Sequence, residues 1–160
     1  MAGLRNGTEF PRLVMARANG GELVLPEELQ GSYGVVLAYR GSWCLRCNAQ
    51  LASFQEMLPA LAEAGIKVVA FSTDDEEHAL EMVDSHGLDF PVGFGVDMRK
   101  VGEILQGYIN EERGSLESSN FLLRPDGTIE LAVYASGPIG RLTPEDILDF
   151  INRRRLRSAL

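Results

Sequence analysis

Two cysteines separated by two residues form the part of this sequence best suited to covalent chemistry. Cys44 and Cys47 are the chain's two cysteines, and they lie in the segment Trp43-Cys44-Leu45-Arg46-Cys47. One pair cannot supply the framework of a disulfide-stabilised domain, and this spacing is typical of a redox pair or of half a metal site. Redox chemistry is therefore the first hypothesis for the function.

The elements expected around the pair give the two cysteines different roles. An apolar run that ends at Tyr39 predicts a strand, and a helix is expected to begin near Cys44. Free N–H groups and the helix dipole at such a position stabilise a thiolate, which is the reactive form of cysteine. Cys47 falls on the apolar face of the helix. We therefore expect Cys44 to attack a disulfide or a peroxide and Cys47 to resolve the product as the Cys44–Cys47 disulfide.

Charged and aromatic neighbours are expected to shape the site. Arg40 and Arg46 bracket the pair, and positive charge beside a thiol favours its thiolate form. Trp43 directly precedes Cys44 and is expected to shield one side of it.

Two other interpretations of the cysteines stay open at this point. Free cysteine is among the most buried residue types, so the pair is also consistent with two inert core residues. A zinc site would combine Cys44 and Cys47 with His78 and His86. The histidines lie well downstream and outside the usual zinc-finger spacing, which makes the metal site the less favoured alternative.

Length, composition and charge restrict the remaining possibilities. The chain has 160 residues, 45% of them hydrophobic, which suits one domain over residues 1–160 whose core needs no disulfide. A formal net charge of -8 argues against nucleic acid or an anionic membrane as a partner. The first ten residues do not resemble a secretory signal, and no apolar run reaches the length of a membrane span. We expect a cytoplasmic protein, in a compartment where thiols stay reduced.

Turn chemistry and apolar runs predict the first strands. Leu13–Arg17 and Glu22–Leu25 flank Ala18-Asn19-Gly20-Gly21, whose residues tolerate positive φ, and this pattern predicts an N-terminal hairpin. The nearly all-apolar runs 35–39 and 66–71 predict two strands that are covered on both faces.

Two helices are expected next to these strands. Apolar positions spaced by three and four residues predict a helix from about Cys44, with a late kink at Pro59. Thr73 followed by Glu76 resembles a capping box and predicts the start of a second helix, which should end at Gly87.

The remaining elements complete a mixed sheet. Residues 90–96 are expected to form a short strand or loop, and a helix should follow from Met98. Runs 121–123 and 129–134 flank Pro and Asp-Gly turn chemistry and predict a second hairpin, and Thr143 opens the last helix. Alternating strands and helices with a closing hairpin predict an α/β fold: a central mixed sheet flanked by helices.

Several motifs of this chain together resemble a known family. They are Tyr39 to Leu51, Gly65-Ile66-Lys67-Val68-Val69-Ala70, His86-Gly87-Leu88, Phe90-Pro91-Val92-Gly93, Phe121 with Pro125-Asp126-Gly127, and Ser136-Gly137-Pro138-Ile139-Gly140-Arg141-Leu142. These segments resemble the AhpC/TSA redoxins, a peroxiredoxin-like branch of the thioredoxin superfamily, over nearly the whole chain after residue 10.

The resemblance implies a thioredoxin-like fold with an N-terminal β-hairpin extension, in which Cys44 is the active nucleophile and Cys47 its partner. Leu45 stands where this branch usually carries the proline of Trp-Cys-Pro-x-Cys. Gly41 stands where peroxiredoxins carry a threonine or serine that positions the peroxide, and Ser42 lies next to it.

Two further positions differ from thioredoxins. Ala38 occupies the place of their buried acid on the strand before the motif, and Ser118 occupies the place of the cis-proline that faces the disulfide. Ser118 is expected either to offer its hydroxyl to Cys44 or to a substrate, or to satisfy a local turn.

The hypothesis from the sequence is an antioxidant-type oxidoreductase that exchanges thiols and disulfides through the Cys44–Cys47 pair. A thiol peroxidase that reduces hydroperoxides through a Cys44 sulfenic acid is the close alternative, and a non-catalytic protein-binding module is the alternative from another class. The expected partners are a protein or small-molecule disulfide, or a hydroperoxide, together with a thiol reductant. No bound cofactor is expected, and self-association is compatible with the sequence.

Overall fold

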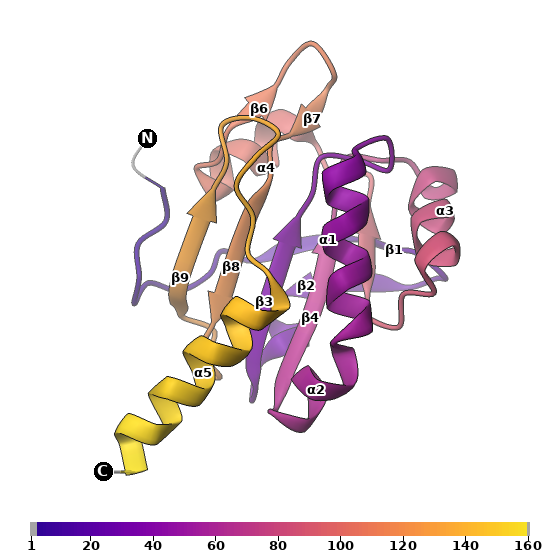
Figure 1. Ribbon diagram of the computed structural model, residues 1–160. Coiled ribbons are helices and arrows are strands. Elements are labelled where there is room, and N and C mark those ends of the chain that lie inside the picture. Colours follow the sequence, from indigo (N-terminus) through magenta and orange to yellow (C-terminus); the bar gives the residue numbers. More distant parts are fainter. Residues whose placement is uncertain (1–2, 160) are drawn as a thin grey trace.

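Seven strands of the chain form one mixed sheet in the order β2-β1-β5-β4-β3-β8-β9 (Figure 1), in a computed structural model that describes residues 3–159. The strands are β1 Leu13–Arg17, β2 Glu22–Leu25, β3 Tyr33–Ala38, β4 Ile66–Phe71, β5 Val92–Phe94, β8 Ser119–Leu123 and β9 Ile129–Tyr134. A separate two-stranded ribbon consists of β6 Ile109–Asn110 and β7 Ser115–Leu116.

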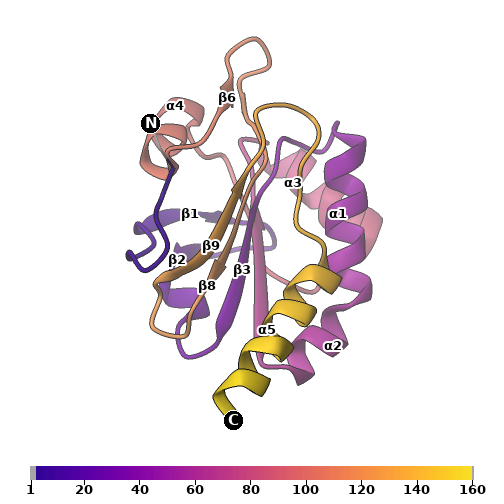
Figure 2. The ribbon, with the colours of Figure 1, turned by 60° about the vertical axis from the view of Figure 1, so that its left-hand side comes forward.

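The helices lie against the two faces of this sheet. They are α1 Leu45–Glu56, α2 Leu58–Glu63, α3 Glu76–His86, α4 Met98–Leu105 and α5 Pro144–Ala159, with a short 3-10 helix at Glu27–Leu29. Figure 2 shows α1, α2 and α5 on one side of the central strands, and α4 and the β1–β2 hairpin on the other. No helix in the described part of the chain combines the length and the apolar character that crossing a membrane requires.

Strand β3 supplies both halves of the core because its side chains alternate between the faces of the sheet. Val35 and Leu37 pack in the cluster beneath α1, α2, α3 and α5, whereas Val36 and Ala38 pack in the cluster shared with the hairpin and α4. All four of these side chains are fully buried. A strand covered on both faces is therefore confirmed for this apolar run.

Strand pairing places β3, which leads into the loop before Cys44, inside the sheet between β4 and β8. β3 runs parallel to β4, with Val35 opposite Val68, and β4 runs parallel to β5. β8 pairs antiparallel with β3, and β1 pairs antiparallel with β5. The β1–β2 and β8–β9 hairpins therefore form the two edges of the sheet, on either side of the parallel strands. The predicted mixed sheet with a thioredoxin-like arrangement and an N-terminal hairpin is confirmed.

Two predicted helix boundaries are wrong by a few residues. The helix after Cys44 breaks at Met57 and not at Pro59, which lies in the first turn of α2, where its missing N–H costs no hydrogen bond. α3 begins after Asp75, whose carboxylate accepts the N–H of His78 at 3.0 Å, and not at Thr73. The 3-10 helix and the β6–β7 ribbon were not predicted from the sequence.

Candidate active site

Cys44 is the N-cap residue of α1. Its backbone is extended, and its sulfur accepts the N–H of Cys47 at 3.3 Å. The first turn of α1 contains no acidic residue, so its free N–H groups and dipole act on the thiol without competition from a carboxylate. The side chain is 4% exposed. The sequence predicted this position at the helix start, and the structure places Cys44 there.

Cys47 lies one turn further along α1 and is fully buried. Burial raises the pKa of the Cys47 thiol to about 11, and its hydrogen bond to Cys44 acts in the same direction. Burial also opposes ionisation of Cys44, but hydrogen bonds from the Cys47 thiol and backbone N–H, and the charges of Arg141 and Arg40, lower the pKa of Cys44 below its usual value. The opposite pKa shifts suit Cys44 as the thiolate nucleophile and Cys47 as the thiol that stays protonated.

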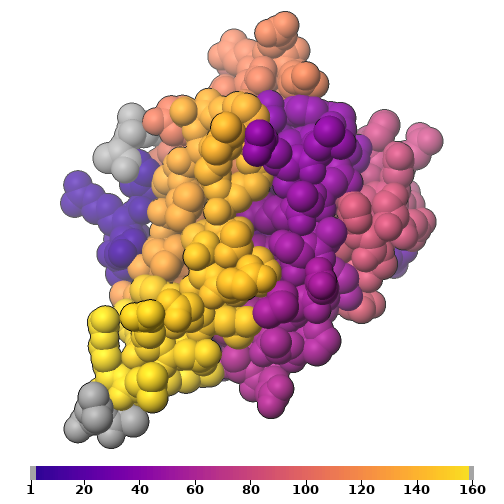
Figure 3. Space-filling view, viewed as in Figure 1, coloured from indigo at the N-terminus to yellow at the C-terminus, as the bar shows by residue number. Residues whose placement is uncertain are grey.

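Arg141, which was not predicted as a site residue, contacts both sulfurs. Its Nη2 lies 3.5 Å from Cys44 Sγ and 3.1 Å from Cys47 Sγ, although it is 97 residues from Cys44 in the chain. Arg141 belongs to the segment 135–143 between β9 and α5, which Figure 3 shows lying against α1. The one signal in the sequence was its membership of the Ser136–Leu142 motif that carries part of the family resemblance.

A buried amide network holds the segment 135–143 in place. The Oδ1 of Asn120, on β8, accepts the backbone N–H of Leu142 at 2.9 Å and the Nε2 of Gln50 at 3.0 Å. Gln50 Nε2 also donates to the carbonyl of Leu142 at 2.9 Å. Ser118 is buried beside this network, and its hydroxyl accepts Nδ2 of Asn120 at 3.3 Å. The sequence suggested Cys44, a substrate or a local turn as the partner of the Ser118 hydroxyl, and the structure shows a hydrogen bond to the side chain of Asn120.

Arg40 is the second guanidinium beside the nucleophile. Its Nη1 lies 3.8 Å from Cys44 Sγ, and its backbone N–H donates to Cys47 Sγ at 3.4 Å. Arg40 is itself fixed by Glu117, at 3.1 Å, and both side chains are nearly buried. The predicted proximity of Arg40 to the thiols is therefore observed, and Glu117 is a partner that the sequence did not indicate.

Trp43 is 41% exposed, and two guanidiniums lie over its ring. The Arg40 group is 4.8 Å and the Arg113 group 4.0 Å from the centre of its ring, distances at which cation–π attraction operates. The indole also covers Gly41, where a Cβ would collide with the ring nitrogen. A threonine or serine at that position is therefore incompatible with this placement of Trp43.

Ser42 contributes through its backbone. Its N–H donates to Asp74 Oδ2 at 2.8 Å, and its carbonyl accepts Nδ2 of Asn48 at 2.8 Å. The Asn48 Nδ2 donates equally to the carbonyl of Cys44, and its Oδ1 pairs with Nε2 of His86 at 2.7 Å. These bonds tie the loop before Cys44 to α1 and α3.

The remaining predicted residues lie apart from the thiols. Arg46 is exposed on α1 and makes no hydrogen bond to either sulfur within the described residues. The two histidines of the zinc alternative have other partners, since His78 pairs with Asp75 and His86 with Asn48. Across residues 3–159, no three His, Cys, Asp or Glu side chains form a group that could hold a metal.

Comparison with known proteins agrees with this geometry. Residues 6–132 match the AhpC/TSA family. The thiol-disulfide oxidoreductase ResA of Bacillus anthracis is 26% identical over 148 residues, which cover 92% of this chain and 77% of ResA. A peroxiredoxin of Methanothermobacter thermautotrophicus is 26% identical over 144 residues, which cover 87% of this chain and 68% of that protein.

Solved structures share the fold. A mutant of peroxiredoxin 6 from Arenicola marina superposes with a TM-score of 0.80 at 20% identity, over 98% of this chain and 76% of that one. AhpC of Enterococcus faecalis gives a TM-score of 0.78 at 16% identity, over 98% and 95% of the two chains. The family match spans well over half of the sequence, including the strand, the loop and the helix that carry both thiols, and the chain therefore belongs to the AhpC/TSA family.

Proposed function

We propose that this AhpC/TSA protein is a thiol-disulfide oxidoreductase that cycles between the dithiol and the Cys44–Cys47 disulfide. The observation that carries the proposal is the contrast between the two thiols: the pKa of Cys44 is lowered, whereas that of Cys47 is raised to about 11. Relatives that are thiol-disulfide oxidoreductases and peroxiredoxins support an oxidoreductase and not a non-catalytic binding module.

The proposed reaction has two displacement steps. The Cys44 thiolate attacks one sulfur of a substrate disulfide, forms a mixed disulfide and releases the first substrate thiolate. Cys47 then loses its proton to solvent, and its sulfur attacks Cys44 Sγ and releases the second thiolate. The two protein thiols are thereby oxidised by two electrons and the substrate disulfide is reduced to two thiols. Arg141 contacts both sulfurs, so one cation serves the anion in each step.

Hydroperoxide reduction is the second candidate, because Arg40 and Arg141 place two cations beside Cys44 Sγ. In that reaction, the Cys44 thiolate would attack the peroxide oxygen and release hydroxide or an alkoxide, and Cys47 would condense with the sulfenic acid to give water and the same disulfide. Gly41 under Trp43 supplies no hydroxyl for the peroxide, which favours the disulfide substrate. An antioxidant role depends on this second candidate, and the cytoplasmic location stays a prediction.

The experiment that separates the two candidates follows Trp43 fluorescence in stopped flow. Reduced protein is mixed with hydrogen peroxide or with bis(hydroxyethyl) disulfide, alongside Cys44→Ser and Cys47→Ser, and the products are weighed by mass spectrometry. We expect fast oxidation by the disulfide, an internal Cys44–Cys47 bond, and a trapped mixed disulfide in Cys47→Ser. Fast reaction with peroxide alone would establish the peroxidase instead. If neither reagent gives a change that depends on Cys44, the redox function is wrong.

A further inference from the structure

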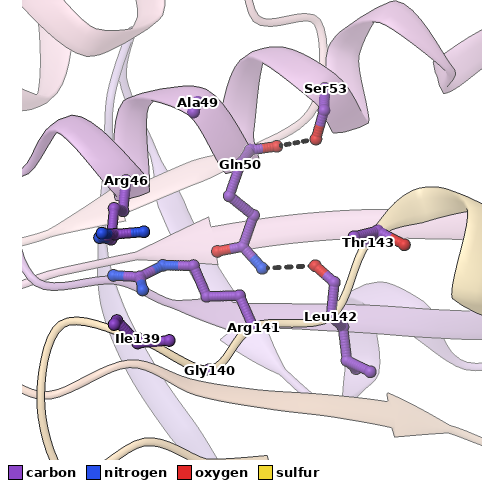
Figure 4. Close-up of a pocket in the computed structure, with 9 residues that line it drawn as sticks. All are labelled: Arg46, Ala49, Gln50, Ser53, Ile139, Gly140, Arg141, Leu142 and Thr143. Atoms are coloured by element: carbon purple, nitrogen blue, oxygen red, sulfur yellow. Dashed lines mark hydrogen bonds between the residues drawn. The ribbon is translucent and has the colours of Figure 1, made fainter.

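A cavity opens beside Arg141, between α1 and the segment 135–143. It has a volume of about 360 Å³, which falls in the range of roughly 300–1,000 Å³ common for small-molecule sites. Figure 4 shows Arg46 and Gln50 entering it from α1, opposite Ile139, Arg141 and Leu142 of the segment. Arg141 also contacts both sulfurs, so its side chain separates the cavity from the nucleophile Cys44.

Two cations line this cavity without a carboxylate to neutralise them. Within residues 3–159, neither Arg46 nor Arg141 forms an ion pair with a carboxylate, although Arg141 donates hydrogen bonds to both cysteine sulfurs and to the carbonyl of Pro138. The chain as a whole carries a formal net charge of -8, so this arrangement is opposite in sign to the average surface. A guanidinium without a carboxylate partner is a site for a ligand carboxylate, which accepts hydrogen bonds from the planar fork of arginine. Arg46 can offer this fork, and Arg141 adds its positive charge to the same cavity.

A buried acceptor in the same cavity also lacks a partner. Gln50 is 6% exposed, and its Nε2 is engaged by Asn120 and Leu142. Its Oε1 is buried and makes no hydrogen bond to any described residue, and Figure 4 shows this oxygen on the side of the two arginines. An unpaired buried acceptor is costly, so a ligand N–H or O–H that donates to it would be stabilised.

We propose that this cavity binds a small disulfide that carries carboxylate groups, with one carboxylate between Arg46 and Arg141. Gln50 Oε1 accepts a hydrogen bond from an amide or hydroxyl of the ligand, and Ile139, which is 70% exposed, contacts its methylene groups. Arg141 connects the two places, because it lines the cavity and its Nη2 lies 3.5 Å from Cys44 Sγ. The inference rests on the proposed function and specifies its substrate class.

The reaction of such a substrate follows the same balance. Cys44 displaces one carboxylate-bearing thiolate, the other half stays in the cavity as the mixed disulfide, and Cys47 displaces it as the second thiolate. Arg46 and Arg141 keep their charges throughout, so the cavity can bind another anionic disulfide after the product has left.

The test compares three disulfides that differ in charge: dithiodiglycolate, a dianion; bis(hydroxyethyl) disulfide, which is neutral; and cystamine, a dication. Second-order rate constants are measured by Trp43 fluorescence for the natural protein, Arg46→Gln, Arg46→Glu and Arg157→Gln. Arg157 is exposed near the end of α5 and is the matched control for a change in net charge. The ratio of dianion to neutral rate constants is compared between variants, so that the intrinsic reactivity of each disulfide cancels.

We expect Arg46→Gln to lower that ratio by about threefold to fivefold, the size of one partly screened ion pair. Arg46→Glu should lower it further and favour cystamine, and Arg157→Gln should leave it unchanged. An unchanged ratio in Arg46→Gln, or an equal fall in Arg157→Gln, would overturn the subsite while leaving the oxidoreductase standing.

A binding measurement keeps the subsite testable if no disulfide reacts. Adipate, a dicarboxylate without sulfur, is titrated into Cys44→Ser with and without Arg46→Gln. We expect saturable binding that Arg46→Gln weakens by a similar factor. Absence of saturable binding by adipate would count against the subsite independently of the redox function.

Discussion

At the scale of single residues, one guanidinium connects the chemistry of both thiols. Arg141 lies 3.5 Å from Cys44 Sγ and 3.1 Å from Cys47 Sγ, so its charge favours whichever sulfur is anionic. Burial nevertheless keeps the pKa of Cys47 at about 11, and that thiol stays protonated near neutral pH. Alkylation near neutral pH should therefore modify Cys44 first.

Replacing Arg141 by methionine should make Cys44 less reactive. The change removes a cation that lowers the pKa of Cys44, so less thiolate is present at a given pH below that pKa. We expect the iodoacetamide rate near neutral pH to fall by about fivefold, the size of one close ion pair, and the midpoint of the pH–rate profile to move to higher pH.

Arg141→Lys is the matched variant, because it keeps the charge and loses the planar fork. It should give a midpoint between those of the natural protein and Arg141→Met. A midpoint that stays in place in Arg141→Met would mean that Arg40, helix α1 and Cys47 stabilise the thiolate without Arg141.

At the scale of elements, the site depends on how the segment 135–143 is fastened to α1 and β8. Asn120 of β8 accepts one hydrogen bond from α1, through Gln50 Nε2, and one from the segment, through the N–H of Leu142. The segment itself has little regular structure, so these bonds decide where Arg141 lies. A substitution in this network should therefore change the pKa of Cys44 indirectly, by moving Arg141.

Substituting Asn120 by alanine tests this coupling. Two donors lose a buried acceptor, which should lower the free energy of unfolding by about 2 kcal/mol, as measured by urea denaturation. Because Arg141 is then less firmly held, the pH–rate profile of Cys44 should move in the same direction as in Arg141→Met, by a smaller amount.

Ser118→Ala is the control for the Asn120 variant, since it removes one weak bond to Asn120 Nδ2 and leaves the Oδ1 contacts intact. We expect a smaller loss of stability and an unshifted profile. A shift in Ser118→Ala as large as that in Asn120→Ala would instead give Ser118 a direct part in the chemistry.

At the scale of the whole molecule, α5 joins the last hairpin to the core. Ile147 and Ile151 of α5 are buried in the cluster that also contains both cysteines. Further along α5, Arg154 pairs with Glu130 of β9. The Glu130 side chain is 3% exposed and also pairs with Arg124, at 2.7 Å. This ion triad fastens the C-terminal helix to the edge strand of the sheet.

Removal of Glu130 should destabilise the protein without altering its chemistry. Glu130→Ala leaves two guanidiniums without their partner, and because both are partly exposed and can be hydrated, the loss should be about 2 kcal/mol in urea denaturation. The pH–rate profile of Cys44 should be unchanged. A profile that moves with this variant would show that α5 also controls the position of Arg141.

The sequence by itself determined the features that depend on neighbours along the chain. The apolar run 66–71 predicted β4 with its observed bounds, and turn chemistry predicted both hairpins. Cys44 and Cys47 could be given roles because the helix that follows the strand and its loop holds Cys44 at its N-terminus and Cys47 on its buried face. The family resemblance was likewise carried by local motifs.

Tertiary structure decided which charges and amides meet these thiols. Arg46 directly precedes Cys47 in the sequence but makes no hydrogen bond to either sulfur within the described residues, whereas Arg141, 94 residues further along the chain from Cys47, contacts both. Helix α3 starts two residues late because the carboxylate of Asp75 caps it, while that of Asp74 accepts the N–H of Ser42. Local patterns record backbone preference and burial, but the field at a thiol depends on side chains that only the packing of distant segments brings within a few ångströms.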